Sequence, residues 1–167
     1  MLSIGLTNPK NVSNVGAVMR AVGCFGADRV FYSGVRYDRA REFDTDTGQV
    51  TASVPLRHSG DLVAEVTNQQ SLICVEFALG AQSLTTFEHP NNAFYLFGPE
   101  DASLQQWVID AAAHVVFVPT EGCLNLAASV NVVLYDRMAK SKAHGARVYN
   151  DALIERSRDN RNRLKCP

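Results

Sequence analysis

The stretch Phe94-Tyr-Leu-Phe-Gly98-Pro99-Glu100-Asp101 runs from apolar residues into a glycine–proline turn that ends in two carboxylates. A second stretch, Val116-Phe-Val-Pro119-Thr-Glu-Gly122-Cys-Leu-Asn125-Leu-Ala-Ala, shows the same order of apolar run, turn and helix-like segment. This pattern predicts two buried strands, each followed by a turn and a helix. In open α/β folds such turns form the ligand site, because they place backbone N–H and C=O groups at the carboxyl ends of the strands.

The rest of the chain repeats this alternation. Strands are predicted over residues 2–6, 29–33, 71–79, 93–97 and 114–118. Helices are predicted from Val15 onward, with Ser13 or Asn14 as the cap, and over residues 60–69, 103–113 and 124–143. Residues 36–59 are polar and are expected to be irregular. The alternation predicts an α/β fold with a mostly parallel sheet flanked by helices.

Size and charge limit the classes of function. The 167 residues, 46% hydrophobic and 20% charged, predict a single domain over residues 1–167 whose core needs no metal or disulfide. The formal net charge is −1, so a nucleic acid would have to be bound by local basic patches. One such patch is the polar tail from about residue 145, which holds six Lys or Arg against three Asp or Glu.

The cysteines indicate a reducing compartment. Cys24, Cys74, Cys123 and Cys166 are far apart and form no CxxC pair, so free thiols are expected rather than zinc ligands or disulfides. No metal site is predicted. The N-terminal residues lack the pattern of a signal peptide, and no apolar run reaches the roughly 20 residues of a membrane span. We therefore expect a cytoplasmic protein that does not bind membranes.

A third segment, Asn14-Val-Gly-Ala-Val-Met-Arg20, adds polar side chains to the predicted site. Arg20 could grip a phosphate beside a glycine-rich helix start, or it could simply face solvent. Glu100 and Asn125 stand at the two predicted turns, where each could instead only cap a helix. The functional interpretation depends on Asn14, Arg20, Glu100 and Asn125 meeting in one composite site.

Other candidates are weaker. The fingerprint GxGxxG is absent, which disfavours a dinucleotide-dependent oxidoreductase. Cys123 has no accompanying motif of a nucleophile, and Trp107 is expected to pack in a helix. Four arginines in the polar segment are a solvated face or a phosphate-binding patch: Arg36, Arg39, Arg41 and Arg57. The four histidines lack metal-ligand spacing and are expected on the surface or in loops: His58, His89, His114 and His144.

At its three segments the chain resembles the SpoU/TrmH branch of the SPOUT RNA methyltransferases, over nearly its whole length. The first motif of that family is matched by Asn14, Gly16, Arg20 and Phe25-Gly26. The second is matched by Gly98-Pro99-Glu100, and the third by Val118-Pro119 followed by Cys123-Leu124-Asn125. Two departures stand out: Cys123 replaces a serine, and Ala102-Ser103-Leu104 replaces a common Gly-Leu.

The resemblance implies a fold, a cofactor and a reaction. The family's sheet carries a C-terminal trefoil knot, and S-adenosyl-L-methionine binds within it. The matching cofactor residues here are Gly98, Val118, Cys123 and Leu124, with Glu76 contributing from the preceding strand. The family is a homodimer with its active site at the interface, and it transfers a methyl group to a ribose 2′-hydroxyl.

Three functions follow in order. The first is an S-adenosylmethionine-dependent ribose 2′-O-methyltransferase of RNA, with tRNA favoured over rRNA. The second is a catalytically silent RNA-binding or assembly protein on the same fold, and the third is the disfavoured oxidoreductase. The catalytic set implied is Arg20 with Asn14, Glu100 and Asn125. Because a guanidinium holds its proton tightly, we expect Arg20 to orient the 2′-oxygen or the adjacent phosphate rather than act as the base.

Overall fold

The computed structural model describes residues 1–41, 54–141 and 155. Seven strands form one sheet in the order β3-β2-β1-β6-β4-β7-β5, and every pairing between neighbours is parallel. Their bounds are β1 Leu2–Leu6, β2 Arg29–Tyr32, β3 Leu56–His58, β4 Ser71–Val75, β5 Gln82–Ser83, β6 Ala93–Phe97 and β7 His114–Phe117. The prediction of an α/β fold with a mostly parallel sheet is confirmed.

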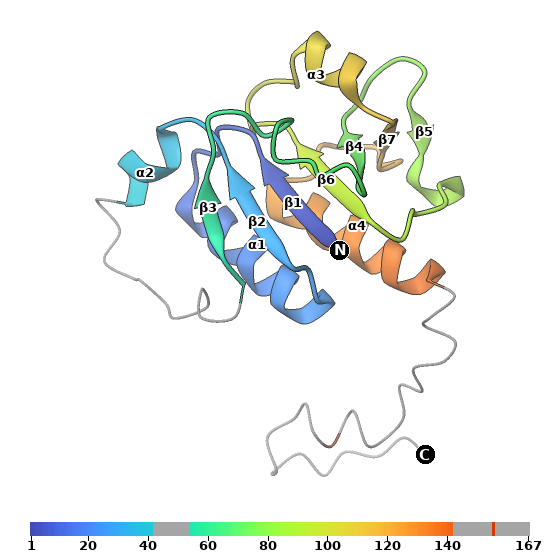
Figure 1. Cartoon of the computed structure of the whole chain (residues 1–167), viewed down its shortest axis with the longest axis horizontal. Helices are drawn as coiled ribbons and strands as arrows, with labels where there is room; N and C mark the ends of the chain where they lie inside the picture. Colours follow the sequence, from blue (N-terminus) through green and yellow to red (C-terminus); the bar gives the residue numbers. More distant parts are fainter. Residues whose placement is uncertain (42–53, 142–154, 156–167) are drawn as a thin grey trace.

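Helices cover both faces of this sheet. The helices α1 (Val12–Phe25) and α4 (Leu126–Lys140) lie side by side on one face and share a core with the strands (Figure 1). The short helix α3 (Gln106–Ala111) packs on the opposite face through Val108, which joins a second core around Phe94 and Leu96. A parallel sheet covered on both faces has apolar strands throughout, which explains why the strands were legible in the sequence.

The central strands β1 and β6 are buried along their whole length. Gly5 is required in β1, because a Cβ there would lie 2.6 Å from the ring of Phe94 and 2.7 Å from a methyl group of Leu96. The neighbouring Ser3 is one of the few buried polar residues, and its hydroxyl accepts a hydrogen bond of 3.0 Å from the amide of Gln70. The sheet centre is therefore closely packed and excludes ligands, which leaves the strand ends for a site.

Several element boundaries differ from the prediction for local reasons. Helix α1 begins at Val12, because the side chain of Asn11, and not that of Ser13 or Asn14, caps it by accepting from the N–H groups of Ser13 and Asn14. Strand β4 ends at Val75 rather than at residue 79, since the chain turns directly after Glu76.

Two predicted helices are also corrected. Residues 60–69 form successive turns closed by three-residue hydrogen bonds, with Asp61 accepting from the N–H groups of Val63 and Ala64. Ser103 caps no helix: α3 starts only at Gln106. Trp107 of α3 is half exposed rather than packed.

The polar segment expected to be irregular contains helix α2 (Arg36–Arg41) and strand β3. A short 3₁₀ helix, Leu84–Thr86, follows β5. The turn at residues 44–48, the last residues of the predicted helix 124–143 and the basic tail from residue 145 lie outside the described residues. The trefoil knot stays a prediction, because strand order and pairing do not specify how the loops pass one another.

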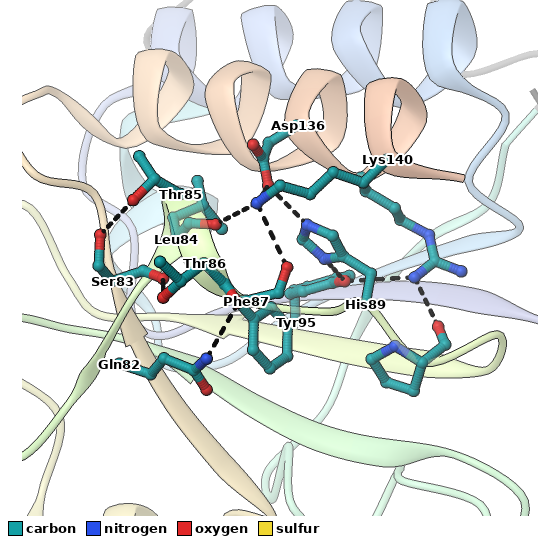
Figure 2. Close-up of polar contacts among 12 residues, drawn as sticks. Gln82, Ser83, Leu84, Thr85, Thr86, Phe87, His89, Tyr95, Asp136 and Lys140 are labelled. Atoms are coloured by element: carbon teal, nitrogen blue, oxygen red, sulfur yellow. Dashed lines mark hydrogen bonds and ion pairs between the residues drawn. The ribbon is translucent and has the colours of Figure 1, made fainter. Parts of the chain in front are cut away.

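A buried polar network joins the loop before β6 to α4 (Figure 2). The His89 side chain is only 4% exposed, and its ring contacts the hydroxyl of Tyr95 and, at 2.8 Å, the carboxylate of Asp136. Lys140 adds a 2.8 Å ion pair to Asp136 and donates to the carbonyl oxygens of Leu84 and Phe87. His89 is thus a loop residue whose side chain is buried, a feature that the sequence reasoning missed.

Electrostatics in this network favour the neutral histidine. Burial lowers the pKa of His89; Asp136 opposes this effect, while the positive charges of Arg137 and Lys140 add to it. Burial likewise raises the pKa of Tyr95 to about 12, so its hydroxyl keeps its proton. A neutral His89 can then donate to Asp136 and accept from Tyr95, whose oxygen accepts from Arg137 at 3.3 Å.

We predict that this network makes the protein less stable in weak acid. The unfolded chain binds a proton at His89 below pH about 6.5, while the folded pKa is lower, so the free energy of unfolding should fall as the pH drops below that value. The variant His89→Gln should lose about 1–3 kcal/mol near pH 7.5, through unsatisfied buried partners, and should show a weaker pH dependence. Urea unfolding between pH 7.5 and 5.5 measures both effects, with the exposed His114→Gln as control. An unchanged pH profile in His89→Gln would contradict the prediction.

Candidate functional site

The carboxyl ends of three adjacent strands enclose a cavity of about 180 Å³. Strand β4 contributes Val75 and the residues that follow it, β6 contributes Phe97 and the turn after it, and β7 contributes Phe117 and the loop that leads to α4. The strands are in register, because Val75 pairs with both Phe97 and Val116. The cavity therefore lies where ligands bind in open α/β sheets.

Glu76 ties two of these segments together. One carboxylate oxygen accepts the N–H of Phe77 at 3.0 Å, and the other accepts the N–H of Leu104 at 2.9 Å. The first bond fixes the turn after β4, and the second holds the far end of the turn after β6. Glu76 thus shapes the cavity wall while its carboxylate stays among the lining groups.

Gly98 is needed where Glu76 meets the second turn. A Cβ at this position would lie 3.1 Å from the Glu76 carboxylate and 3.5 Å from the carbonyl oxygen of Ala102. A side chain would therefore push against a charged group and against backbone on the other side. The glycine allows the turn after β6 to approach Glu76 closely, and it leaves the cavity open.

Glu100 connects the cavity to the start of α1. Its carboxylate accepts a 3.1 Å hydrogen bond from the amide of Asn14 and another of 3.1 Å from the backbone N–H of Lys10. Burial by itself raises the pKa of Glu100, but the hydrogen bonds from Asn14 and from the backbone of residues 100, Lys10 and Asn11 outweigh it and lower the pKa. Glu100 is therefore an anionic acceptor that orients Asn14, and not a proton donor near neutral pH.

A charged cluster lies beside this pair. The guanidinium of Arg36 contacts both carboxylate oxygens of Asp101, at 2.9 and 3.2 Å, and Lys10 contacts the same carboxylate at 3.1 Å. The hydrogen bonds from Arg36 and then Lys10 lower the pKa of Asp101. These contacts join the loops after β1, β2 and β6, and they assign Arg36 a local partner that its position in the sequence did not reveal.

The third turn supplies the remaining wall. Val118, Cys123 and Leu124 all line the cavity, and the thiol of Cys123 is free. The turn is held by Thr120, whose hydroxyl donates to the carbonyl oxygen of Gly122 at 2.7 Å. All five residues expected to bind a cofactor, Glu76, Gly98, Val118, Cys123 and Leu124, therefore face one cavity.

The four residues expected to act in catalysis are not all brought together. Glu100 lines the cavity and holds Asn14. Asn125 instead caps α4, with its side-chain oxygen accepting the N–H of Ala128 at 2.8 Å, and it is not a lining residue. Arg20 is exposed and lines a separate hollow between α1 and α4, together with Gly16 and Asn131.

Helix geometry explains why Arg20 separates from Asn14. Six residues at 3.6 per turn rotate a side chain by about 240° around the helix axis, so the two residues cannot face the same wall. The sequence reasoning also missed the lining residues Phe77, Phe117 and Ser129. Phe77 had a detectable signal, since it is an aromatic residue placed directly after a strand.

The family follows from comparison with known proteins. The model of the family described as "SpoU rRNA Methylase family" matches residues 1–135, which include all three turns and Arg20. The chain belongs to the SpoU rRNA methylase family. A comparison with curated protein sequences gives no match.

Solved structures of SpoU and TrmH proteins share the fold. An rRNA methyltransferase from Sinorhizobium meliloti has a TM-score of 0.68 at 19% identity, with 83% of this chain and 55% of that chain covered. A TrmH/SpoU tRNA modifying enzyme from A. aeolicus has a TM-score of 0.72 at 15% identity, with 93% and 84% covered. A structure described as "Structural insights into the 2-OH methylation of C/U34 on tRNA" has a TM-score of 0.67 at 22% identity, with 84% and 95% covered.

The neighbours differ in length. The chain spans 55% of the Sinorhizobium protein and 60% of a TrmH-family protein from Porphyromonas gingivalis. Within the described part of this SpoU chain, no helix is long and apolar enough to cross a membrane. The same residues contain no group of three His, Cys, Asp or Glu side chains placed to hold a metal ion.

We predict that the Glu76 carboxylate is structurally required. In Glu76→Gln one acceptor oxygen is replaced by an NH₂ group, which cannot accept either the Phe77 or the Leu104 N–H. The free energy of unfolding should fall by about 1–3 kcal/mol, the usual cost of losing such a bond. Denaturant unfolding measures this loss, with the exposed Glu88→Gln as the matched control. Equal stability of the two variants would show that Glu76 does not hold the turns.

Proposed function

We propose that this protein is an S-adenosylmethionine-dependent RNA methyltransferase that transfers a methyl group to a ribose 2′-hydroxyl, with tRNA favoured over rRNA. The observation that carries the proposal is the cavity at the ends of β4, β6 and β7, lined by all five residues that match the family's cofactor positions. Membership of the SpoU family supports the same reaction class.

The cavity fits an S-adenosyl ligand in its chemistry. Its walls are mainly apolar, from Val75, Phe97, Val118 and Leu124, and Glu76 adds a carboxylate that can accept from ribose hydroxyls. Structures of the Sinorhizobium rRNA methyltransferase and of a SpoU methyltransferase from Streptomyces viridochromogenes were obtained with AdoMet bound. When bound, the sulfonium would supply an activated methyl group, so the protein must mainly align the acceptor.

The charged residues would position the acceptor RNA. Asn14, held by the anionic Glu100, presents an oriented amide near the second turn. Arg20 carries a permanent positive charge on an exposed surface, so it can orient the ribose oxygen or bind the adjacent phosphate. In this proposal Asn125 acts indirectly, through its cap of the helix that follows the third turn.

A homodimer would reconcile the separate positions of Arg20 and the cavity. The exposed face of α1 and α4 carries Gly16 with no atoms near it and, on α4, the exposed apolar side chains of Val132 and Tyr135. Pairing of two copies across this face would bury the apolar side chains and could bring Arg20 of one protomer to the cavity of its partner. The proposed active site is then shared between protomers.

The preference for tRNA has modest but specific support. The neighbour described by methylation of C/U34 on tRNA is matched over 95% of its length, whereas the Sinorhizobium rRNA methyltransferase is matched over 55%. A cytoplasmic location agrees with the free, exposed thiols of Cys24 and Cys123.

Calorimetric titration with S-adenosylhomocysteine tests the cofactor site without knowledge of the RNA. We expect binding near one ligand per protomer, and the variant Gly98→Val should bind at least tenfold more weakly, because its side chain meets the Glu76 carboxylate. The control is Gly60→Ala, at an exposed glycine whose added Cβ contacts nothing. A folded wild-type protein that binds no S-adenosylhomocysteine and methylates no RNA would favour a silent RNA-binding protein instead.

Mixed dimers test the shared active site. Arg20→Ala and Gly98→Val should each abolish methyl transfer to unmodified tRNA, one through the acceptor and the other through the cofactor. When the two variants are mixed and allowed to exchange subunits, activity should return, because half of the sites in each mixed dimer are intact. If Arg20 acts within its own protomer, every site in the mixed dimer keeps one defect and no activity returns.

A further inference from the structure

Phe77 is an exposed aromatic residue at the edge of the proposed cofactor cavity. Its side chain is 60% exposed although it lines the cavity. Of the large apolar side chains that the structure leaves exposed among the described residues, only Phe77 and Leu124 line this cavity. Exposed apolar surface at the edge of a cavity is typical of a place where a ligand completes the packing.

The position of Phe77 is fixed by its surroundings. Its backbone N–H donates to Glu76 at 3.0 Å, directly after β4 ends. Its ring lies 5.9 Å from the ring of Phe117, measured between centroids and tilted by 45°. Phe117 belongs to β7 and also lines the cavity, so the two aromatic residues form one apolar end of it.

The opposite end of the cavity is polar. Glu100 follows β6 and holds Asn14 of α1, on the side of β6 that faces β1 in the sheet order. Phe77 and Phe117 lie on the other side, where β4 pairs with β7. A ligand that fills the cavity therefore meets aromatic rings at one end and an amide and a carboxylate at the other.

We propose that Phe77 stacks on the adenine ring of the S-adenosyl ligand. This inference rests on the proposed function. A planar heteroaromatic ring suits the aromatic end, since such rings prefer offset or tilted contacts with phenyl groups. The reacting end of the ligand would then lie toward Asn14 and Glu100, where the acceptor is expected. Phe77 acts as a binding residue for the cofactor, with no part in the transfer itself.

The chain offers a matched control for this proposal. Leu79 lies two residues further along the same loop and is fully exposed, but it does not line the cavity. Phe77→Ala and Leu79→Ala both shorten an exposed apolar side chain of one loop. Because Phe77 is mostly exposed, its replacement should leave the thermal unfolding temperature nearly unchanged, which is checked first.

Calorimetry on the full chain provides the main test. S-adenosylhomocysteine should bind Phe77→Ala about tenfold more weakly, the effect of about 1.4 kcal/mol of lost stacking. Phe77→Tyr should bind as the wild type does, and so should Leu79→Ala. A 5′-methylthioadenosine titration should show the same order, because that compound keeps the adenine and lacks the amino acid.

The outcomes separate this inference from the proposed function. Wild-type binding with equal affinity in Phe77→Ala would overturn the stacking proposal and leave the methyltransferase proposal intact. Unchanged affinity for S-adenosylhomocysteine with weaker binding of tRNA would also overturn it, by assigning Phe77 to the RNA. Failure of the wild-type protein to bind S-adenosylhomocysteine would overturn both proposals.

A fluorescence measurement reports the contact directly. The chain has one tryptophan, Trp107, which is exposed on α3. In a Trp107→Phe background, Phe77→Trp introduces a single indole at the edge of the cavity. Stacking predicts that 5′-methylthioadenosine quenches its emission, while methionine, which lacks the ring, does not. Equal emission with and without 5′-methylthioadenosine would contradict the stacking.

Discussion

The parallel register of β4, β6 and β7 is the constraint on which the rest of the site depends. It places Val75 beside Phe97 and Val116, so the chain leaves the sheet at the same level in all three strands. The three turns then converge, and Glu76 can hold the first two by accepting one N–H from each. The closely packed sheet centre, where Gly5 leaves no space for a side chain, directs a ligand to this edge.

Around this edge, interactions with the backbone count for more than exposed ion pairs. The bonds of Glu76 and of Glu100 with backbone N–H groups have fixed partners and partial burial. The pairs that Arg36 and Lys10 make with Asp101 are more exposed, and each should contribute only about 0.2–1 kcal/mol. Their value lies in joining three loops that carry the recognised motifs, and Arg36 remains accessible enough to exchange Asp101 for a phosphate.

The other end of the sheet is used differently. There the chain buries His89, Tyr95 and Asp136 in a closed network that attaches the loop before β6 to α4 (Figure 2). Each polar group in it has a partner, and such networks favour one arrangement of loop and helix. The same helix α4 begins at the third turn of the cavity, so the network stabilises the helix on which that turn ends.

The sequence by itself determined the α/β class, the central strands and the residues that line the cavity, because buried parallel strands and Gly or Pro turns are local patterns. Only the tertiary structure decided which side chains meet. It brought Asn14 to Glu100 across 86 positions and His89 to Asp136 across 47, and it separated Arg20 from the cavity by the rotation of α1. Long-range contacts of this kind depend on strand order and helix orientation, which are properties of packing and leave no periodic signal along the chain.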